Sequence, residues 1–161
     1  MRTTEKFVFF WGKEDVFSNF FYKPFKHEGK LFKWSEQAIM YRKAKHFGAY
    51  NVADRILNAR SPMECKKLGR SIIQFVEQDW VTVRELIYKE VLLDKFSEPQ
   101  LKKRILDTSD KVLVEASPYD GIWGIRLAHD HPDAENPEKW RGLNLLGKVL
   151  MEVRDELDGK K

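Results

Sequence analysis

The chain is short enough for one domain and too apolar for a disordered protein. Its 161 residues are 42% hydrophobic and 13% aromatic, which supplies a core for a single domain over residues 1–161. Lysine and arginine number 29 against 25 aspartates and glutamates, which gives a net charge of +4. This mildly basic balance is compatible with a phosphorylated ligand, whereas no run of basic residues indicates a nucleic-acid-binding tail.

The single cysteine fits a reducing compartment, and the hydropathy of the chain fits a protein outside the membrane. Cys65 is the only cysteine, so an internal disulfide is excluded. No apolar run approaches the roughly 20 residues that cross a bilayer, and residues 1–10 lack the pattern of a signal peptide. We therefore expect a cytoplasmic protein with no membrane partner.

The first half of the chain is predicted to form a strand, a hairpin and three helices. The apolar run at residues 6–12 (KFVFFWG) ends at a glycine and is typical of a buried strand. A hairpin is expected to turn at residues 27–30 (HEGK). Ser61, Pro62 and Glu64 form a capping box with proline at the first helical position. The predicted helices span residues 35–48, 50–58 and 61–69.

The second half of the chain is predicted to contain a long helix, a short helix, a strand and a final helix. Apolar residues recur at helical spacing from Asp79 through Phe96. Residues 97–109 suit a short helix, and β-branched residues in 110–117 (DKVLVEAS) favour a strand. The final helix is amphipathic and ends at Gly159; its apolar residues are Leu143, Leu146, Leu150, Val153 and Leu157. The fold class is therefore α+β: one helix-rich domain with a small sheet built partly from the N-terminus.

Familiar catalytic and metal-binding motifs are missing. The sequence has no phosphate-binding loop, no dinucleotide fingerprint and no nucleophile elbow. Cys65, His129 and His131 could be imagined as zinc ligands, but the HDH segment lacks the usual ligand spacing. We predict that the protein uses no metal and no other cofactor.

Polar and aromatic residues at the edges of predicted elements are the candidates for a site. Taken singly, each has a structural explanation. Glu36, for example, complements the dipole of a helix whose N-cap would be Ser35, and Trp80 lies on the apolar stripe of its own helix. The full set is Asn19, Glu36, Arg60, Arg70, Trp80, Glu115, residues 119–124 (YDGIWG) and Asn144.

Taken together, these residues lie in segments that resemble one protein family. The segments are FSNF, WSEQAIMYRKAKHF, ARSPMECKKLGR, DW before a long helix, LVEASPYDGIWGIRL and WRGLNLLGKVLMEVRDEL. In this order, from about Phe9 to Leu157, the chain resembles the YbiA-like proteins, also called NADAR domains. It departs from the family pattern at Gln37, Arg126 and Leu143, where His, Gly and Gln are frequent.

The resemblance implies an N-glycosidase, which breaks the bond between ribose C1′ and a nitrogen. Some family members hydrolyse ribosylamine phosphates, the early intermediates of riboflavin synthesis. Others remove ADP-ribose from guanine bases of nucleic acid, so nucleic acid enters only as an ADP-ribosylated substrate. Carried over by position, Glu36 matches the active-site glutamate, Trp80 a substrate-pocket tryptophan, and Asp120 with Trp123 an acidic-aromatic pair.

The chemistry of such a bond agrees with these residue types. Loss of an N-linked group from ribose passes through an oxocarbenium-like cation, which Glu36 or Asp120 could stabilise while orienting a water. Trp80 or Trp123 could stack on the leaving group. The candidates for binding the phosphate are Arg60, Arg70 and Lys45.

Lys45 raises a geometric difficulty. It follows Glu36 by nine residues, about 900° around a straight helix, so the two side chains would point to opposite faces. Either the helix ends or bends between them, or only Glu36 lines the pocket. A Schiff base between Lys45 and the opened sugar is a less favoured variant.

A catalytically silent module that binds ADP-ribose or another nucleotide is the main alternative. It could use the same aromatic and cationic residues without turnover. Retention of both Glu36 and Asp120 favours an enzyme, because a binder of anionic ligands gains little from two carboxylates in its pocket.

Overall fold

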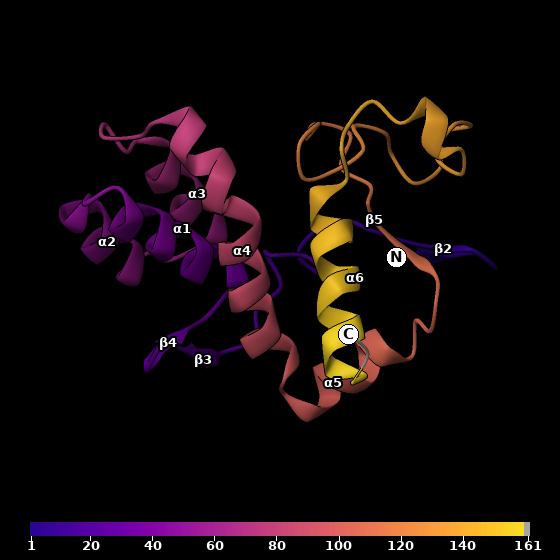
Figure 1. Ribbon diagram of the computed structural model, residues 1–161, viewed down its shortest axis with the longest axis horizontal. Coiled ribbons are helices and arrows are strands. Elements are labelled where there is room, and N and C mark those ends of the chain that lie inside the picture. Colours follow the sequence, from indigo (N-terminus) through magenta and orange to yellow (C-terminus); the bar gives the residue numbers. More distant parts are fainter. Residues whose placement is uncertain (160–161) are drawn as a thin grey trace. The chain divides into compact units, whose positions relative to one another are not determined.

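The computed structural model describes residues 1–159 and divides them into two compact units. We call Asn19–Glu98 the central unit. Met1–Ser18 together with the chain from Pro99 onward form the terminal unit. Figure 1 shows the helices and strands of both units, coloured along the chain.

The central unit consists of a hairpin and four helices. Strands β3 (Phe25–His27) and β4 (Lys30–Phe32) pair antiparallel, and Glu28 and Gly29 turn the chain with positive φ angles, as the sequence predicts. Helix α1 contacts each of the other three helices, α2, α3 and α4. Their bounds are α1 Ser35–His46, α2 Tyr50–Leu57, α3 Pro62–Arg70 and α4 Glu77–Phe96.

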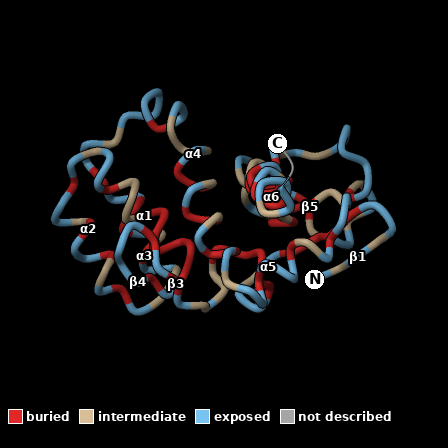
Figure 2. The backbone as a smooth tube through the Cα atoms, turned by 60° about the horizontal axis from the view of Figure 1, so that its bottom comes forward, coloured by how far each residue is buried: buried red, intermediate tan, exposed pale blue. Residues whose placement is uncertain are grey.

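Burial explains this arrangement of helices. Helix α1 buries Ala38, Ile39 and Ala44, and α4 alternates between buried and exposed positions along its length (Figure 2). Helix α3 crosses α1 closely at Gly69, where an added Cβ would lie 2.1 Å from the Sδ atom of Met40. The predicted capping box is present in part. Ser61 accepts from the Glu64 amide, while the Glu64 carboxylate accepts from the amide of Arg60 rather than of Ser61.

The terminal unit is built on a small sheet of three strands. The sheet has the order β1-β2-β5, with β1 (Arg2–Thr3) antiparallel and β5 (Val112–Glu115) parallel to β2 (Phe7–Phe10). Two helices complete the unit, α5 (Pro99–Leu106) and α6 (Leu145–Leu157), and α6 packs on β5.

A segment with little regular structure connects β5 to α6. Apart from the short 3-10 helix η1 (Pro137–Lys139), it is made of turns. Its apolar residues pack on the sheet in one cluster; these are Ile125, Leu127, Ala134 and Trp140, against Phe7, Phe9 and Val114.

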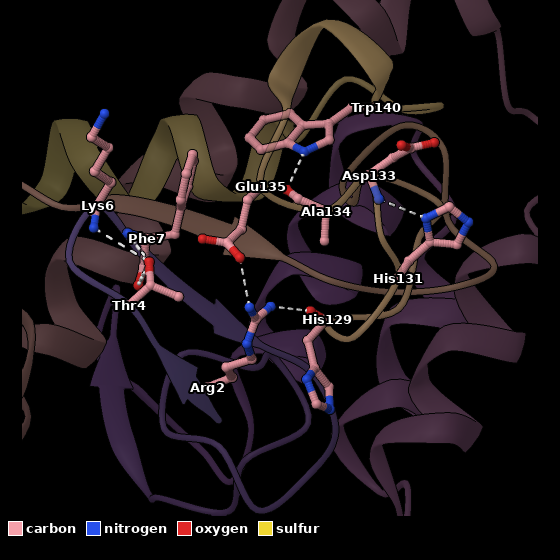
Figure 3. A network of polar contacts seen from close by, with 10 residues as sticks. All are labelled: Arg2, Thr4, Lys6, Phe7, His129, His131, Asp133, Ala134, Glu135 and Trp140. Carbon is pink, nitrogen blue, oxygen red and sulfur yellow. Dashed lines mark hydrogen bonds and ion pairs between the residues drawn. The ribbon is translucent and has the colours of Figure 1, made fainter.

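Polar contacts hold the same segment to the N-terminal strand (Figure 3). Arg2 makes a 2.7 Å ion pair with Glu135 and donates to the carbonyl of His129. The indole N–H of Trp140 donates to the carbonyl of Ala134 at 2.7 Å. These bonds satisfy polar groups in a stretch that has few backbone ladders of its own.

Two details differ from the sequence prediction. The N-cap of α1 is Trp34, and Ser35 is a fully buried helical residue that does not cap the helix. Leu143 precedes α6 and is 65% exposed, because Asn144 adopts a left-handed conformation (φ 53°) that starts the helix only at Leu145.

Candidate functional site

The start of α1 fixes the backbone and side chain of Glu36. The Glu36 amide, which has no partner within its own helix, donates to the carbonyl of Asn19 at 3.0 Å. The Glu36 side chain is only 7% exposed. A carboxylate in this position is held at the buried side of the helix rather than in solvent, so helix capping alone does not explain it.

Gln37 ties the same end of α1 to its neighbours. Its Oε1 accepts from the Lys33 amide at 2.8 Å, and its Nε2 donates to the carbonyl of Ile56 at 3.0 Å. The buried amide thus joins α1 to the end of α2. At this position, where the family often has His, the side chain of this protein has a structural use.

Lys43 is a candidate site residue that the sequence reasoning missed. It follows Glu36 by seven residues, about 700° or nearly two full turns, so both lie on one face of α1. The Lys43 Nζ lies 4.7 Å from the ring centre of Phe75 and 5.4 Å from that of Trp80. The spacing of seven residues was the signal that could have found it.

The surroundings of Lys43 change its acidity. Burial lowers the pKa of Lys43 below its ordinary value of 10.5. The negative charge of Glu36 opposes this shift, the positive charge of Arg70 adds to it, and Glu77 opposes it more weakly. A lysine with a lowered pKa is a better proton donor and a better nucleophile than an ordinary one.

The aromatic residues beside Lys43 come from three segments. The ring of Phe47 lies 5.3 Å from Phe75 and 6.3 Å from Trp80, centre to centre. Trp80 is buried, as the apolar stripe of α4 predicts, while Phe75 in the loop before α4 is partly exposed. Trp80 therefore serves the core and at the same time flanks the Lys43 ammonium.

Lys45 lies away from this group. Helix α1 runs without a break from Ser35 to His46, so the bend that would bring Lys45 to Glu36 does not occur. Lys45 is exposed, with its Nζ 5.9 Å from the ring of Tyr41 and 5.1 Å from that of Tyr50.

Arg60 lies in a separate hollow of the central unit. This open hollow of about 380 Å³ is lined by Asp54, Arg55, Asn58, Arg60 and Glu64, and it does not include Glu36 or Lys43. Arg70, in contrast, is close enough to Lys43 to affect its charge. Of the two arginines predicted to bind phosphate, only Arg70 belongs to the Glu36–Lys43 group.

In the terminal unit, Asp120 organises a turn. Its Oδ1 accepts from the amides of Ile122 and Trp123 at 2.8 and 2.9 Å, and Ser117 Oγ accepts from the amide of Asp120 itself. The carbonyl of Trp123 then accepts from the Leu146 amide in the first turn of α6. Asp120 and Trp123 are thus brought together, with one carboxylate oxygen already used by the backbone.

Asn144 joins this turn to the sheet. Its Nδ2 donates to the carbonyl of Leu113, and its Oδ1 accepts from the amide of Glu115, each at 3.0 Å. Two backbone segments also pack closely beside Asn144: an added Cβ on Gly142 would lie 2.3 Å from the carbonyl oxygen of Gly124. Both polar ends of the Asn144 amide therefore bind β5, which makes it a structural anchor beside Glu115.

Cys65 and the histidines considered as zinc ligands lie in ordinary surroundings. Cys65 is buried in α3, and burial together with the charge of Glu36 raises its pKa to about 12, which makes the thiol unreactive. His131 Nδ1 accepts from the Asp133 amide (Figure 3). Within residues 1–159, no three His, Cys, Asp or Glu side chains are grouped to hold a metal ion.

None of the helices described in residues 1–159 combines the length and apolar character needed to cross a bilayer.

Comparison with known proteins defines the class of protein. Residues 9–158 match the model of the NADAR domain. An N-glycosidase of Acanthamoeba polyphaga mimivirus is 38% identical over 165 residues, which cover 95% of this chain and 97% of that protein. The NMR structure of the Escherichia coli protein YbiA has a TM-score of 0.74 and 27% identity, covering 98% of this chain and 88% of that one.

A plant relative covers a smaller part of the chain. The chloroplastic riboflavin biosynthesis protein PYRR of Arabidopsis thaliana is 37% identical over 117 residues, which are 70% of this chain but 18% of that protein.

The chain therefore belongs to the NADAR domain family. Within this family it groups with the YbiA-like N-glycosidases. The resemblance inferred from the sequence motifs, the helix-rich YbiA-like fold and the enzyme class, a hydrolase acting on N-glycosyl bonds, are confirmed.

Proposed function

We propose that this protein hydrolyses the C1′–N bond of a phosphorylated riboside, such as the ribosylamine phosphates of riboflavin biosynthesis. The observation that carries the proposal is the placement of the buried Glu36 and the half-buried Lys43 on one face of α1, with the Lys43 ammonium beside the rings of Phe75 and Trp80. The relative named as a riboflavin biosynthesis protein supports this choice of substrate.

Glu36 supplies the negative charge that the reaction needs. As the C1′–N bond breaks, positive charge develops on C1′ and the ring oxygen, and a nearby carboxylate stabilises that charge. The same carboxylate orients a water and accepts its proton as the oxygen bonds to C1′. The sugar phosphate and the free amine leave as products.

Lys43 supplies the proton for the leaving nitrogen. Its lowered pKa brings the ammonium closer to the operating pH, where a general acid is most effective. In a second route, the neutral Lys43 amine attacks C1′ of the ring-opened iminium form of the substrate, and the original amine leaves with a proton as the C1′–N bond breaks. Water then hydrolyses the resulting Schiff base, which frees the lysine and the sugar phosphate. Borohydride reduction during turnover distinguishes the two routes, because only the second leaves the sugar on Lys43.

The neighbours of this pair suit a phosphorylated riboside. Arg70 can bind the phosphate through two parallel hydrogen bonds, and the partly exposed ring of Phe75, which lies beside Lys43, offers an aromatic face to the leaving group. Asn19 then acts by holding the Glu36 amide rather than by binding substrate.

In the terminal unit, we assign Asp120 and Asn144 to shaping the loop around Trp123. One Asp120 oxygen and both polar ends of Asn144 are used by backbone groups. The second Asp120 oxygen is the only part of this carboxylate that a substrate could engage without breaking the turn. Trp123 stays a candidate for stacking on substrate, and Glu115 a candidate for binding it.

The experiment is a substrate panel with matched variants. Ribosylamine phosphates, NAD, ADP-ribose and ADP-ribosylated DNA are incubated with the protein, and released sugar and base are detected by mass spectrometry. We expect cleavage of the ribosylamine phosphates, abolished in Glu36→Gln and Lys43→Met. Lys45→Met, which removes a lysine from the other face of the same helix, should keep full activity.

Other outcomes select the alternatives. If ADP-ribosylated DNA were the one compound of the panel that is cleaved, with release of ADP-ribose from guanine, the protein would be an ADP-ribosyl hydrolase. Binding of ADP-ribose with no cleavage of any compound would make it a nucleotide-binding module. Equal loss of activity in Lys45→Met and Lys43→Met would remove the Glu36–Lys43 pair as the basis of the proposal.

A further inference from the structure

A lysine of the central unit is buried more completely than any group that the proposed reaction uses. Lys95, in the last turn of α4, is 1% exposed. Its Nζ donates to the hydroxyl of Ser35 at 3.4 Å and lies 5.1 Å from the ring centre of Phe96 and 6.0 Å from that of Phe21. Burial of an ammonium group is costly unless polar groups receive it, so a lysine here requires a reason beyond filling space.

The hydroxyl that receives Lys95 belongs to a buried chain of hydrogen bonds. Ser35 is fully buried, and its Oγ donates to Oδ1 of Asn19 at 2.8 Å. The backbone carbonyl of Asn19 accepts from the amide of Glu36 at 3.0 Å. The chain therefore runs from the Lys95 ammonium through Ser35 and Asn19 to the backbone of Glu36.

Donor and acceptor rules give this chain a direction. An ammonium can only donate, so the Ser35 oxygen must accept from Lys95 and its own proton must point elsewhere. The available acceptor is Oδ1 of Asn19, which fixes the side-chain amide of Asn19 and, with it, the peptide whose carbonyl holds Glu36. Networks of buried bonds of this kind rigidify the groups at their ends.

We infer that Lys95 is a positioning residue, which acts through Ser35 and Asn19 to hold Glu36 in place for catalysis. The inference rests on the proposed function in that it takes Glu36 as the reacting carboxylate. It adds a residue to which the proposed reaction gives no step, because the Lys95 ammonium donates to Ser35.

Two variants and their combination test the network. Lys95→Met keeps the length of the side chain and removes the ammonium, while Ser35→Ala removes only the hydroxyl that links Lys95 to Asn19. We expect kcat to fall by about 10-fold or more in each, with little change in KM, because misplacing a reacting group by a fraction of an ångström slows chemistry more than binding. The double variant should lose no more than either single one, because both changes break the same network.

Matched controls come from the same unit. Ser97→Ala removes a serine hydroxyl that bonds the carbonyl of Leu93, and Lys67→Met removes an exposed lysine of α3. Both should keep the kcat of the parent protein. Losses of kcat in Lys95→Met and Ser35→Ala that simply add in the double variant would overturn the network, as would unchanged kcat in both folded single variants.

A second measurement separates this inference from the proposed function. Hydrogen exchange at the Glu36 amide reports the bond to Asn19 directly and needs no substrate. We expect faster exchange at Glu36 in Lys95→Met and Ser35→Ala, with exchange at Ala44 in the last turn of α1 unchanged. If the parent protein cleaves no riboside but the Glu36 amide loses protection, the proposed function fails and the positioning network stands.

Unchanged protection of Glu36 in folded Ser35→Ala overturns the inference, whatever the activity. Should Lys95→Met not fold, Ser35→Ala decides alone, because it removes the hydroxyl that links Lys95 to Asn19 in the inferred network. Loss of kcat and of Glu36 protection then supports the inference, and retention of either overturns it.

Discussion

The central and terminal units use the polar residues of the family motifs in different ways. In the central unit, Glu36 is buried and Lys43 half-buried, and the charge of Glu36 acts on the pKa of Lys43. In the terminal unit, the polar atoms of Asp120 and Asn144 are bound to nearby backbone groups. Residues that look equally functional in a sequence motif can therefore divide into groups suited to chemistry and groups that shape the backbone.

The largest expected effect tests this division at its two carboxylates. Glu36→Gln should lower kcat by about 100-fold or more, because it removes the charge that stabilises the developing cation. Asp120→Asn keeps an oxygen acceptor for the amides of Ile122 and Trp123 and should keep most of the activity. Steady-state kinetics on the cleaved riboside measures both, with circular dichroism as the control for folding.

A reversed result would change the assignment. If Asp120→Asn lost activity as strongly as Glu36→Gln, the free oxygen of Asp120 would have to act on the substrate. If Glu36→Gln kept near-normal rates, the chemistry would have to be sought at Asp120 instead.

The next effect is on stability, in the terminal unit. Asn144→Gly keeps the left-handed backbone available but leaves the Leu113 carbonyl and the Glu115 amide without their side-chain partner. Each buried group left unsatisfied costs about 1–3 kcal/mol, so we expect a clear loss in the free energy of unfolding. Urea denaturation measures it. A loss of activity with unchanged stability would instead make Asn144 a substrate-binding residue.

Local signals in the sequence predicted most of the elements. The capping residues Ser61 and Pro62 mark the start of α3, and the hairpin turn follows from Glu28 and Gly29, because these features depend on neighbours in the chain. The parallel pairing of β2 with β5 joins segments about a hundred residues apart, and no local pattern specifies it.

The site was predicted less completely than the fold. Helical periodicity alone places Lys43 beside Glu36 and Lys45 opposite, so this part could have been found without a structure. The structural roles of Ser35 and Asn144 could not, because each depends on which distant backbone or side chain reaches it in the folded chain. Their residue types are equally common at caps and turns.

A smaller effect is the pH dependence of stability that Lys43 confers. Because burial lowers the pKa of Lys43 in the folded chain below its ordinary value of 10.5, the unfolded chain binds more protons between the two values. The free energy of unfolding should therefore rise with pH between the folded pKa and 10.5. This gain in stability is complete above 10.5, and it is lost as the pH falls through the folded pKa. Thermal melts between neutral pH and pH 10.5 check this against Lys43→Met, which should lack the rise.

The smallest effect reverses the sign seen at Asn144. Arg126 also adopts a left-handed conformation, with φ of 56°, and its guanidinium lies against Gly121, where an added Cβ would be 2.7 Å from Nη2. No hydrogen bond or ion pair of the Arg126 side chain is found among residues 1–159, so nothing comparable to the Asn144 bonds offsets the strain of the backbone. Arg126→Gly should relieve that strain and raise the free energy of unfolding by about 0.5–1 kcal/mol. For a chain of this size, such a gain corresponds to a rise in Tm of about 1–4 °C.

A fall in Tm would mean that the Arg126 side chain stabilises the loop by more than its backbone conformation costs. The two glycine variants together thus separate a left-handed residue kept for its side-chain bonds from one that the fold merely tolerates.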